Sequence, residues 1–210
     1  MTTIDADGRV NIAPMGPVVT MPSAMQSAES CDPGFILRPF AGSRTFDNLI
    51  KSRRAAIHVT DDAALFARAA VGRIDAGPSM VRLLYESEVD QTGEREAASW
   101  AILRQCHRWF AVEVTDINDT PPRFDMRCRV VRSAIEAPFF GFNRAKHAVI
   151  ETAILATRTN LIDADDIRAQ VDALRPLVEK TAGDDERDAF DSLVAEIESV
   201  LQRTTSSGAP

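Results

Sequence analysis

The sequence predicts an α+β protein, in which an antiparallel β-barrel precedes a helical subdomain, and three observations support this fold class. In the first half, apolar residues alternate with polar ones, as they do in half-buried strands. Near residue 140 the apolar spacing changes to a helical period of about 3.6. The 210 residues are 45% hydrophobic and 26% charged, which is typical of globular chains. We therefore expect a barrel domain at 1–138, a helical subdomain at 139–203 and a flexible tail at 204–210.

The barrel region begins with a predicted β-hairpin. The pair Asp7-Gly8 separates two short runs that contain β-branched residues, and such a pair is a strong hairpin signal. The segment from Pro14 to Pro17 then bends the chain, and residues 21–33 have no apolar period and predict a loop. These signals, together with the apolar runs that follow, predict strands at 2–4, 10–12, 18–19, 35–37 and 55–59.

Short helices are predicted between and after these strands. One helix is expected at 46–51, and a second at 63–71, where Thr60-Asp61-Asp62 offers an N-cap. Residues 72–98 are polar and contain glycine, so we expect a short helix and a loop there.

A long two-faced hairpin ends the barrel region. Apolar and polar residues alternate over 110–115 and again over 123–130, on either side of a proline-containing turn at 118–122. Cys128 lies on the apolar face of the second strand, which predicts a core position for its thiol.

Three helices are predicted after residue 140. Asn143 can cap a helix that runs to Arg158, and Asp163 begins a second one. We expect Pro176 to kink or split the second helix, because proline lacks the N–H that the helix would use. Gly183-Asp184 then ends that helix and begins the last one.

The charge distribution excludes some classes of partner. Residues 159–203 carry 12 acidic and 5 basic side chains, whereas the rest of the chain carries 19 of each, so the whole net charge of −7 lies in the C-terminal stretch. A nucleic-acid-binding protein usually presents a basic face, so we expect no nucleic-acid partner for this chain. No apolar run reaches the roughly 18 residues that a membrane helix needs. The three cysteines form no CxxC pair and the N-terminus lacks a signal peptide, which together predict a cytoplasmic protein.

The familiar catalytic motifs are absent from the sequence. It has no GxGxxG after a strand, no P-loop, no GxSxG and no HExxH, and its three histidines lack metal-ligand spacing. We therefore expect no metal site and no hydrolytic machinery. Chemistry supplied by a bound cofactor fits the sequence better.

A cluster of small polar residues offers a candidate phosphate site. Arg38 follows a predicted strand, Gly42 lets the backbone approach a ligand, and Ser43 and Thr45 place hydroxyls at the start of a helix, whose free N–H groups attract anions. A simple Ser/Thr cap on that helix explains the hydroxyls but not the arginine. The spacing favours neither interpretation over the other.

Two further clusters could contact a ligand. Arg144 and Lys146, next to Asn143 and His147, place positive charge in a first helical turn, where the helix dipole favours acids. An anionic partner would offset this unfavourable interaction between the two basic side chains and the helix dipole. Pairing with nearby Asp or Glu in a solvent-exposed turn would do the same. The third cluster contains an amide, a rigid turn and a thioether on which a flat ring could lie; its members are Asn11, Pro14 and Met15.

Five segments, taken in order, resemble a known family. They are TTIDADGRVNIAPMG, RPFAGSRTFDNL, AIHVTDDAALFARA, WFAVEVTDINDTPPRFDMRCRVV and FGFNRAKHAVIETAILATR. Together they are similar to the domain-of-unknown-function-447 family of FMN-binding split-barrel flavoproteins, related to flavin reductases and pyridoxamine-phosphate-oxidase-like proteins. The resemblance covers about residues 1–203 and implies a six-stranded antiparallel split barrel that forms a homodimer, with one FMN at each end of the dimer interface.

The resemblance also implies roles for individual residues. Arg38, Ser43, Thr45 and Asn48 fall where related barrels hold the FMN phosphate and ribityl chain, and Asn11, Pro14 and Met15 fall where the isoalloxazine ring meets backbone. Thr60 and Asp61 could face the ribityl chain or the ring. The segment with Asn143, Arg144, Lys146 and His147 could close the substrate side. Asn is common in the family where His58 stands, so no role is carried over to this histidine.

Three functions follow from this resemblance as hypotheses. The first is an FMN-dependent oxidoreductase or flavin reductase-like protein, in which a nicotinamide donor reduces the flavin and a second compound, such as a small aromatic substrate, accepts the electrons. The second is a non-redox protein that binds a flavin, a deazaflavin or a pterin. The third is a purely structural dimer with an empty cleft.

Overall fold

The computed structural model describes residues 1–20, 33–72, 74–86, 98–118 and 124–207. The chain divides into two compact units, each built from two segments. Unit 1 contains Met1–Thr60 and Asp75–Phe139, and unit 2 contains Asp61–Ile74 and Phe140–Pro210. The division after Phe139 lies one residue from the predicted one, but the expected single domain at 1–138 is corrected, because Asp61–Ile74 belongs with the helices.

The large sheet of unit 1 is antiparallel and, among the described residues, has seven strands in the order β2-β1-β5-β8-β9-β4-β3. All its neighbouring strands run antiparallel, and β8 and β9 form the longest pair. The strands are β1 (Thr2–Ile4), β2 (Val10–Ile12), β3 (Val18–Thr20), β4 (Gly34–Leu37), β5 (Arg54–Val59), β8 (Arg108–Asn118) and β9 (Asp125–Ile135). The strands predicted from alternation and from the Asp7-Gly8 signal are confirmed. The resemblance implied six strands, and this sheet has seven.

A second, two-stranded sheet pairs β6 (Val81–Leu84) with β7 (Trp100–Leu103). The expected short helix within 72–98 is wrong for the described part of that stretch, where β6 forms instead. All four residues of β7 are buried. A continuous apolar run of four residues gives no alternation to identify a strand, so this pairing was not visible in the sequence. The predicted loop at 21–33 and the turn at 118–122 lie almost entirely outside the described residues.

One apolar core of unit 1 lies on one face of the large sheet. Leu49 of helix α1 (Arg44–Ser52) is fully buried in it, so this short helix covers that face. The sheet contributes the other buried residues, which are Phe35, Leu37, Ala55, Ile57, Phe110, Val112, Val114, Met126 and Cys128.

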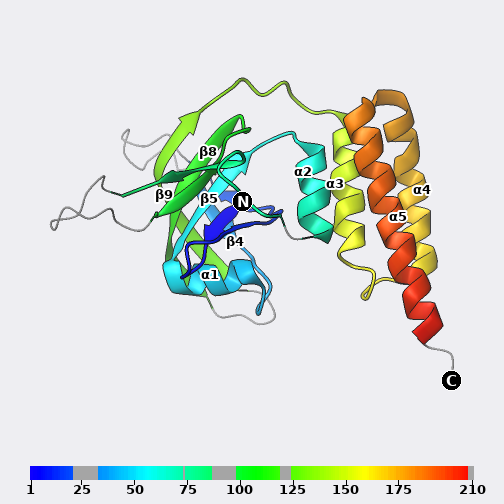
Figure 1. The fold of residues 1–210 in the computed structure, drawn as a ribbon, viewed down its shortest axis with the longest axis horizontal. Helices are drawn as coiled ribbons and strands as arrows, with labels where there is room; N and C mark the ends of the chain where they lie inside the picture. Colours follow the sequence, from blue (N-terminus) through cyan, green and yellow to red (C-terminus); the bar gives the residue numbers. More distant parts are fainter. Residues whose placement is uncertain (21–32, 73, 87–97, 119–123, 208–210) are drawn as a thin grey trace. The chain divides into compact units, whose positions relative to one another are not determined.

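The described part of unit 2 contains four helices that lie alongside one another (Figure 1): α2 (Ala63–Val71), α3 (Arg144–Ala156), α4 (Ala164–Thr181) and α5 (Asp184–Ser207). Their buried apolar faces form one core, in which Ala63 and Ala67 of α2 pack with residues of the three later helices. The predicted caps Asp62, Asn143 and Asp163 are confirmed. No helix in the described ranges is both long and apolar enough to cross a bilayer.

The expectation for Pro176 is decided in part, and the expectation for the tail needs correction. Helix α4 is continuous through Pro176, so it is not split there, and the alternative of a kink stays a prediction. Val171 and Val178, on either side of this exposed proline, are buried in the core of unit 2, and this packing offsets the roughly 3 kcal/mol that an interior proline costs. Helix α5 extends to Ser207, so residues 204–207 are helical rather than a loose tail, and residues 208–210 lie outside the described part.

Candidate functional site

Helix α1 begins with a tight turn that presents backbone and hydroxyl donors. The N–H of Ser43 donates to the carbonyl of Phe40 at 3.1 Å, and Gly42 in this turn has a φ of +79°, which favours glycine. Ser43 is the N-cap, since its Oγ accepts from the N–H of Phe46 at 3.2 Å. The backbone N–H groups of Arg44 and Thr45, in the first turn, have no earlier carbonyl of the helix to which they can donate. This end of α1 therefore favours an anion.

A buried amide–hydroxyl network fixes this end of α1 to the first hairpin. The Asn11 Nδ2 group donates to Thr45 Oγ1 at 3.0 Å and lies 3.5 Å from Thr3 Oγ1, while Asn48 Nδ2 donates to the same Thr3 oxygen at 3.0 Å. Thr3, Thr45 and Asn48 are each less than 10% exposed. Three residues predicted to bind the cofactor, Asn11, Thr45 and Asn48, are therefore brought together. The side-chain amides of the two asparagines donate to threonine hydroxyls within this network.

The fourth member of this network, Thr3, was missed by the sequence analysis. It stands directly opposite Asn11 in the β1–β2 register. Since the hairpin itself was predicted, this cross-strand pair of polar residues was a signal that could have identified Thr3.

Arg38, the arginine of the candidate phosphate site, is held by Asp125. Its Nε lies 2.8 Å from Asp125 Oδ1 and its Nη2 lies 3.2 Å from Oδ2, which is a bidentate pair. The two side chains are 47% and 37% exposed. The hydrogen bond from Arg38 lowers the pKa of the Asp125 carboxyl, so the carboxylate form is favoured. Asp125 is a second residue that the sequence analysis missed, because 87 residues separate it from Arg38.

An aromatic contact connects this ion pair to α1. Phe124, the neighbour of Asp125, packs against Phe46 of the first turn of α1, with ring centroids 4.8 Å apart. Met15 is partly buried against the same core, whereas Pro14 is exposed. The ion pair, the capped helix end and the amide network are thus held by one continuous packed region of unit 1.

The remaining predicted residues lie at the division between the units or within unit 2. Thr60 is the last residue of the first segment of unit 1, and Asp61 begins unit 2. The Asp61 carboxylate accepts from Lys146 Nζ at 2.7 Å, and Glu186 lies 3.7 Å from the same ammonium group. For Lys146, pairing with nearby acids is therefore what the structure shows.

The other members of that segment serve α3. Asn143 caps the helix, since its Oδ1 accepts from the N–H of Lys146 at 3.0 Å, and its Nδ2 lies 3.4 Å from the carbonyl of Thr181. Arg144 and His147 are exposed on the first turn of α3. This segment therefore joins the ends of α3 and α4.

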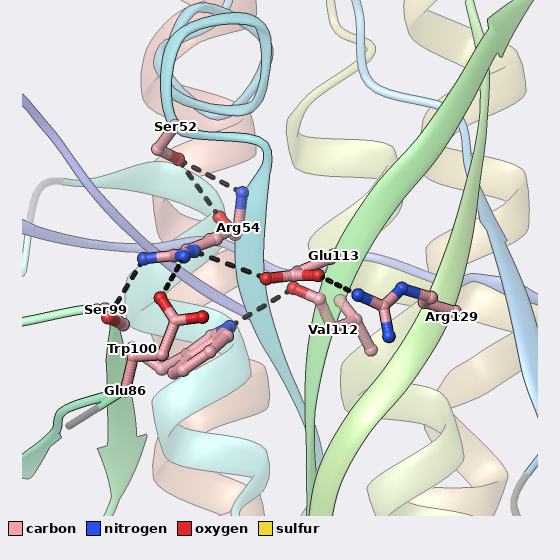
Figure 2. Close-up of polar contacts among 8 residues, drawn as sticks. All are labelled: Ser52, Arg54, Glu86, Ser99, Trp100, Val112, Glu113 and Arg129. Atoms are coloured by element: carbon pink, nitrogen blue, oxygen red, sulfur yellow. Dashed lines mark hydrogen bonds and ion pairs between the residues drawn. The ribbon is translucent and has the colours of Figure 1, made fainter.

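A second polar cluster in unit 1 helps to hold β7 in place (Figure 2). Arg54 donates to Ser99 Oγ at 3.0 Å, pairs with Glu86 and lies 3.6 Å from Glu113, which in turn pairs with Arg129 at 2.6 Å. The Arg54 guanidinium also lies over the ring of Trp100, 5.1 Å from its centroid. Two acids balance two bases here, so the cluster offers no surplus charge to a ligand.

His58 and the two cysteines within the described residues, Cys106 and Cys128, carry no visible reactivity. His58 Nε2 accepts from the N–H of Leu103 at 3.0 Å, and burial lowers the pKa of the imidazole well below its usual value, so the ring is neutral with its proton on Nδ1. Burial raises the pKa of the Cys106 thiol to about 11 and that of Cys128 to about 12. In the described part of the chain, no group of three or more His, Cys, Asp or Glu side chains could hold a metal ion.

Comparison with known proteins identifies the fold class and then the family. The chain has the α+β fold of an FMN-bound protein from Methanosarcina mazei, with a TM-score of 0.70 and 22% identity over 93% of this chain and 91% of that one. The chain belongs to the DUF447 family of proteins of unknown function. The family's N-terminal domain model matches residues 1–137, and a second DUF447 model matches residues 143–195.

Two further solved structures match this chain with TM-scores below 0.5. An FMN-binding protein from Thermus thermophilus with bound p-hydroxybenzaldehyde has a TM-score of 0.48 and 18% identity over 67% of this chain and 73% of that one. The flavin reductase of the styrene monooxygenase from Pseudomonas putida S12 has a TM-score of 0.45 and 15% identity over 65% of this chain and 78% of that one. Among curated proteins, none matches this sequence.

Proposed function

We propose that this protein is an FMN-binding flavoprotein that acts as a homodimer in a redox reaction. The FMN-bound relative from Methanosarcina mazei supports the choice of ligand. The single observation in this chain that carries the proposal is the donor set at the start of α1, where the capped helix end lies in the same packed region as the Arg38–Asp125 pair. Hydroxyl, backbone N–H and guanidinium donors are the groups that bind a phosphate monoester.

The predicted residues on and around the start of α1 have distinct parts in this proposal. Arg38, Ser43 and the first N–H groups of α1 hold the phosphate, because Arg38 is exposed and Ser43 is only partly buried. Thr45 and Asn48 are buried and Asn11 is partly buried, and all three are bonded to one another or to Thr3, so they position that helix end. Met15 and the backbone beside Pro14 supply a surface for the flat ring.

Bound FMN would supply the electron transfer, from a nicotinamide donor to an acceptor such as a small aromatic compound. The protein's own contribution is to bind and orient the flavin. The buried thiols with raised pKa values and the neutral His58 offer no competing acid, base or nucleophile.

The test compares FMN with riboflavin, which lacks the phosphate, by flavin-fluorescence titration of the purified protein. We expect FMN to bind more tightly than riboflavin. Arg38→Ala is expected to weaken FMN by about tenfold to a hundredfold, the range for a lost charge-assisted hydrogen bond, and to leave riboflavin unchanged.

The chain offers a matched control in unit 2. Arg168 and Glu198 form a bidentate pair with both N–O distances at 3.0 Å. Their side chains are 44% and 37% exposed, and these fractions are similar to those of the Arg38–Asp125 pair. Arg168→Ala should leave both flavins unaffected. Failure of the wild-type protein to bind either flavin would reject the proposal, and binding of a pterin or a deazaflavin in their place would support the non-redox alternative.

A further inference from the structure

The Asp125 carboxylate occupies one edge of the Arg38 guanidinium. A guanidinium has five N–H donors, and Asp125 takes the Nε donor and one on Nη2. The outer edge, with both N–H groups of Nη1 and the second of Nη2, makes no hydrogen bond to another described residue. That outer edge has the forked geometry that phosphate oxygens accept.

The backbone fixes where this pair stands. Strands β4 and β9 pair with Leu37 opposite Met126, so Arg38 and Asp125 are the next cross-strand neighbours beyond this register. Phe124, on the other side of Asp125, packs on Phe46 in the first turn of α1. The carboxylate is therefore held by two packed contacts of its strand, whereas Arg38 is a long, half-exposed side chain that would otherwise sample many rotamers.

We propose that Asp125 is a positioning residue, which holds Arg38 with its outer edge ready for the phosphate of the flavin. This inference rests on the proposed function. Asp125 also brings a negative charge near the ligand, but water screens this repulsion strongly at an exposed site. Fixing the arginine beforehand removes an entropy cost that phosphate binding would otherwise bear, so the net effect of Asp125 favours binding.

The test measures FMN and riboflavin affinity for Asp125→Ala and Asp125→Asn. Asp125→Ala is expected to weaken FMN by about fivefold to thirtyfold, the scale set by the rotamer entropy of a long side chain, with riboflavin unchanged. Asp125→Asn keeps an oxygen that can accept from Arg38 Nε and should recover part of the loss. Glu198→Ala, which breaks the matched pair in unit 2, should leave both affinities unchanged.

A double-mutant cycle separates positioning from other effects. If Asp125 acts through Arg38, Asp125→Ala should cause no further loss of FMN affinity when Arg38 is already alanine. An equal loss in that background, an unchanged or tighter FMN affinity in Asp125→Ala, or a parallel loss of riboflavin would each overturn the inference. Absence of flavin binding by the wild-type protein is a different outcome, because it rejects the proposed function itself.

Discussion

The ammonium group of Lys146 lies 2.7 Å from the carboxylate of Asp61, and this pair joins the first turn of α3 to the residue just before the cap of α2. The family resemblance instead implies different sites for the two residues, with Asp61 near the flavin and Lys146 on the substrate side. Glu186 of α5 lies 3.7 Å from the same ammonium group, so three helices of unit 2 meet at one cation. The pair explains why a base is tolerated in the first turn of α3, where the helix dipole favours acids.

Removal of this cation is expected to weaken unit 2. Lys146→Ala should lower the free energy of unfolding by a few tenths of a kcal/mol to about 1 kcal/mol, since both partners are about 30% exposed and solvent screens the pair. Urea unfolding measures the change. Lys180→Ala, at an exposed lysine in the last turn of α4, is the control, and equal effects of the two variants would contradict a specific role for the Asp61 pair.

Loss of the proposed phosphate donors should be visible as loss of colour. Arg38→Ala combined with Ser43→Ala is expected to purify without yellow flavin, because the phosphate loses both a guanidinium and a capping hydroxyl. Absorbance near the flavin maximum, divided by protein concentration, measures the bound fraction. Arg168→Ala with Ser192→Ala, two exposed positions of unit 2, should retain the wild-type ratio. Full flavin content in the Arg38/Ser43 variant would remove these residues from the site.

The amide–hydroxyl network should contribute measurably to stability. Thr3→Val removes the hydroxyl that accepts from Asn48 and leaves that buried amide group without a partner, which should cost about 1–3 kcal/mol. Thermal and urea unfolding give the comparison with Thr115→Val, whose exposed hydroxyl donates to a backbone carbonyl at 3.2 Å. We expect that control to cost less than half as much, and a Thr3→Val protein of wild-type stability would show that the network is dispensable.

His58 should make stability depend on pH on the acidic side of neutrality. Its pKa is lowered in the folded protein, so below about pH 6.5 the unfolded chain binds a proton that the folded chain does not. Stability should therefore fall as the pH drops from 6.5 toward the folded pKa, by at most about 1.4 kcal/mol per pH unit from this residue. His58→Gln keeps an acceptor for Leu103 and should flatten the difference curve between pH 6.5 and 5, whereas an unchanged slope would assign the effect to other groups.

The C-cap residue that follows α1 offers a test of backbone strain. Arg53 has a φ of 57°, the left-handed conformation that glycine adopts without cost, and its N–H donates to the carbonyl of Leu49 at 3.0 Å. Arg53→Gly is expected to raise the free energy of unfolding by up to about 1 kcal/mol. Lys51→Gly, two residues earlier in the helical conformation, should lower it by about the same amount. Destabilisation by both changes would mean that the Arg53 side chain contributes more than its backbone costs.

Local signals predicted most elements of this fold. Asp7-Gly8 identified the first hairpin, and the side chains of Asp62, Asn143 and Asp163 identified where helices begin, because a cap or a two-residue turn acts over three or four residues. Residues that pair across long stretches of sequence were not predictable. Arg38 and Asp125 are separated by 87 residues, and Asp61 and Lys146 by 85. Those contacts depend on strand order and helix packing, which alternation and capping do not encode.

The domain assignment failed for the same reason. Ala63 and Ala67 form the buried face of a helix that lies among strands in the sequence but packs with the C-terminal helices. Small apolar residues of this kind can pack against a sheet or against other helices. The sequence of α2 alone therefore does not show which of the two cores it joins.

The discontinuous unit 2 limits how this chain can be cut. A fragment that ends near residue 139 would keep α2 but lose the helices on which Ala63 and Ala67 pack, and the complementary fragment would expose the apolar side chains of α3 and α5 that α2 covers. The N-terminal family match includes α2. Separate expression of the two matched segments would therefore divide the residues of one hydrophobic core between two polypeptides.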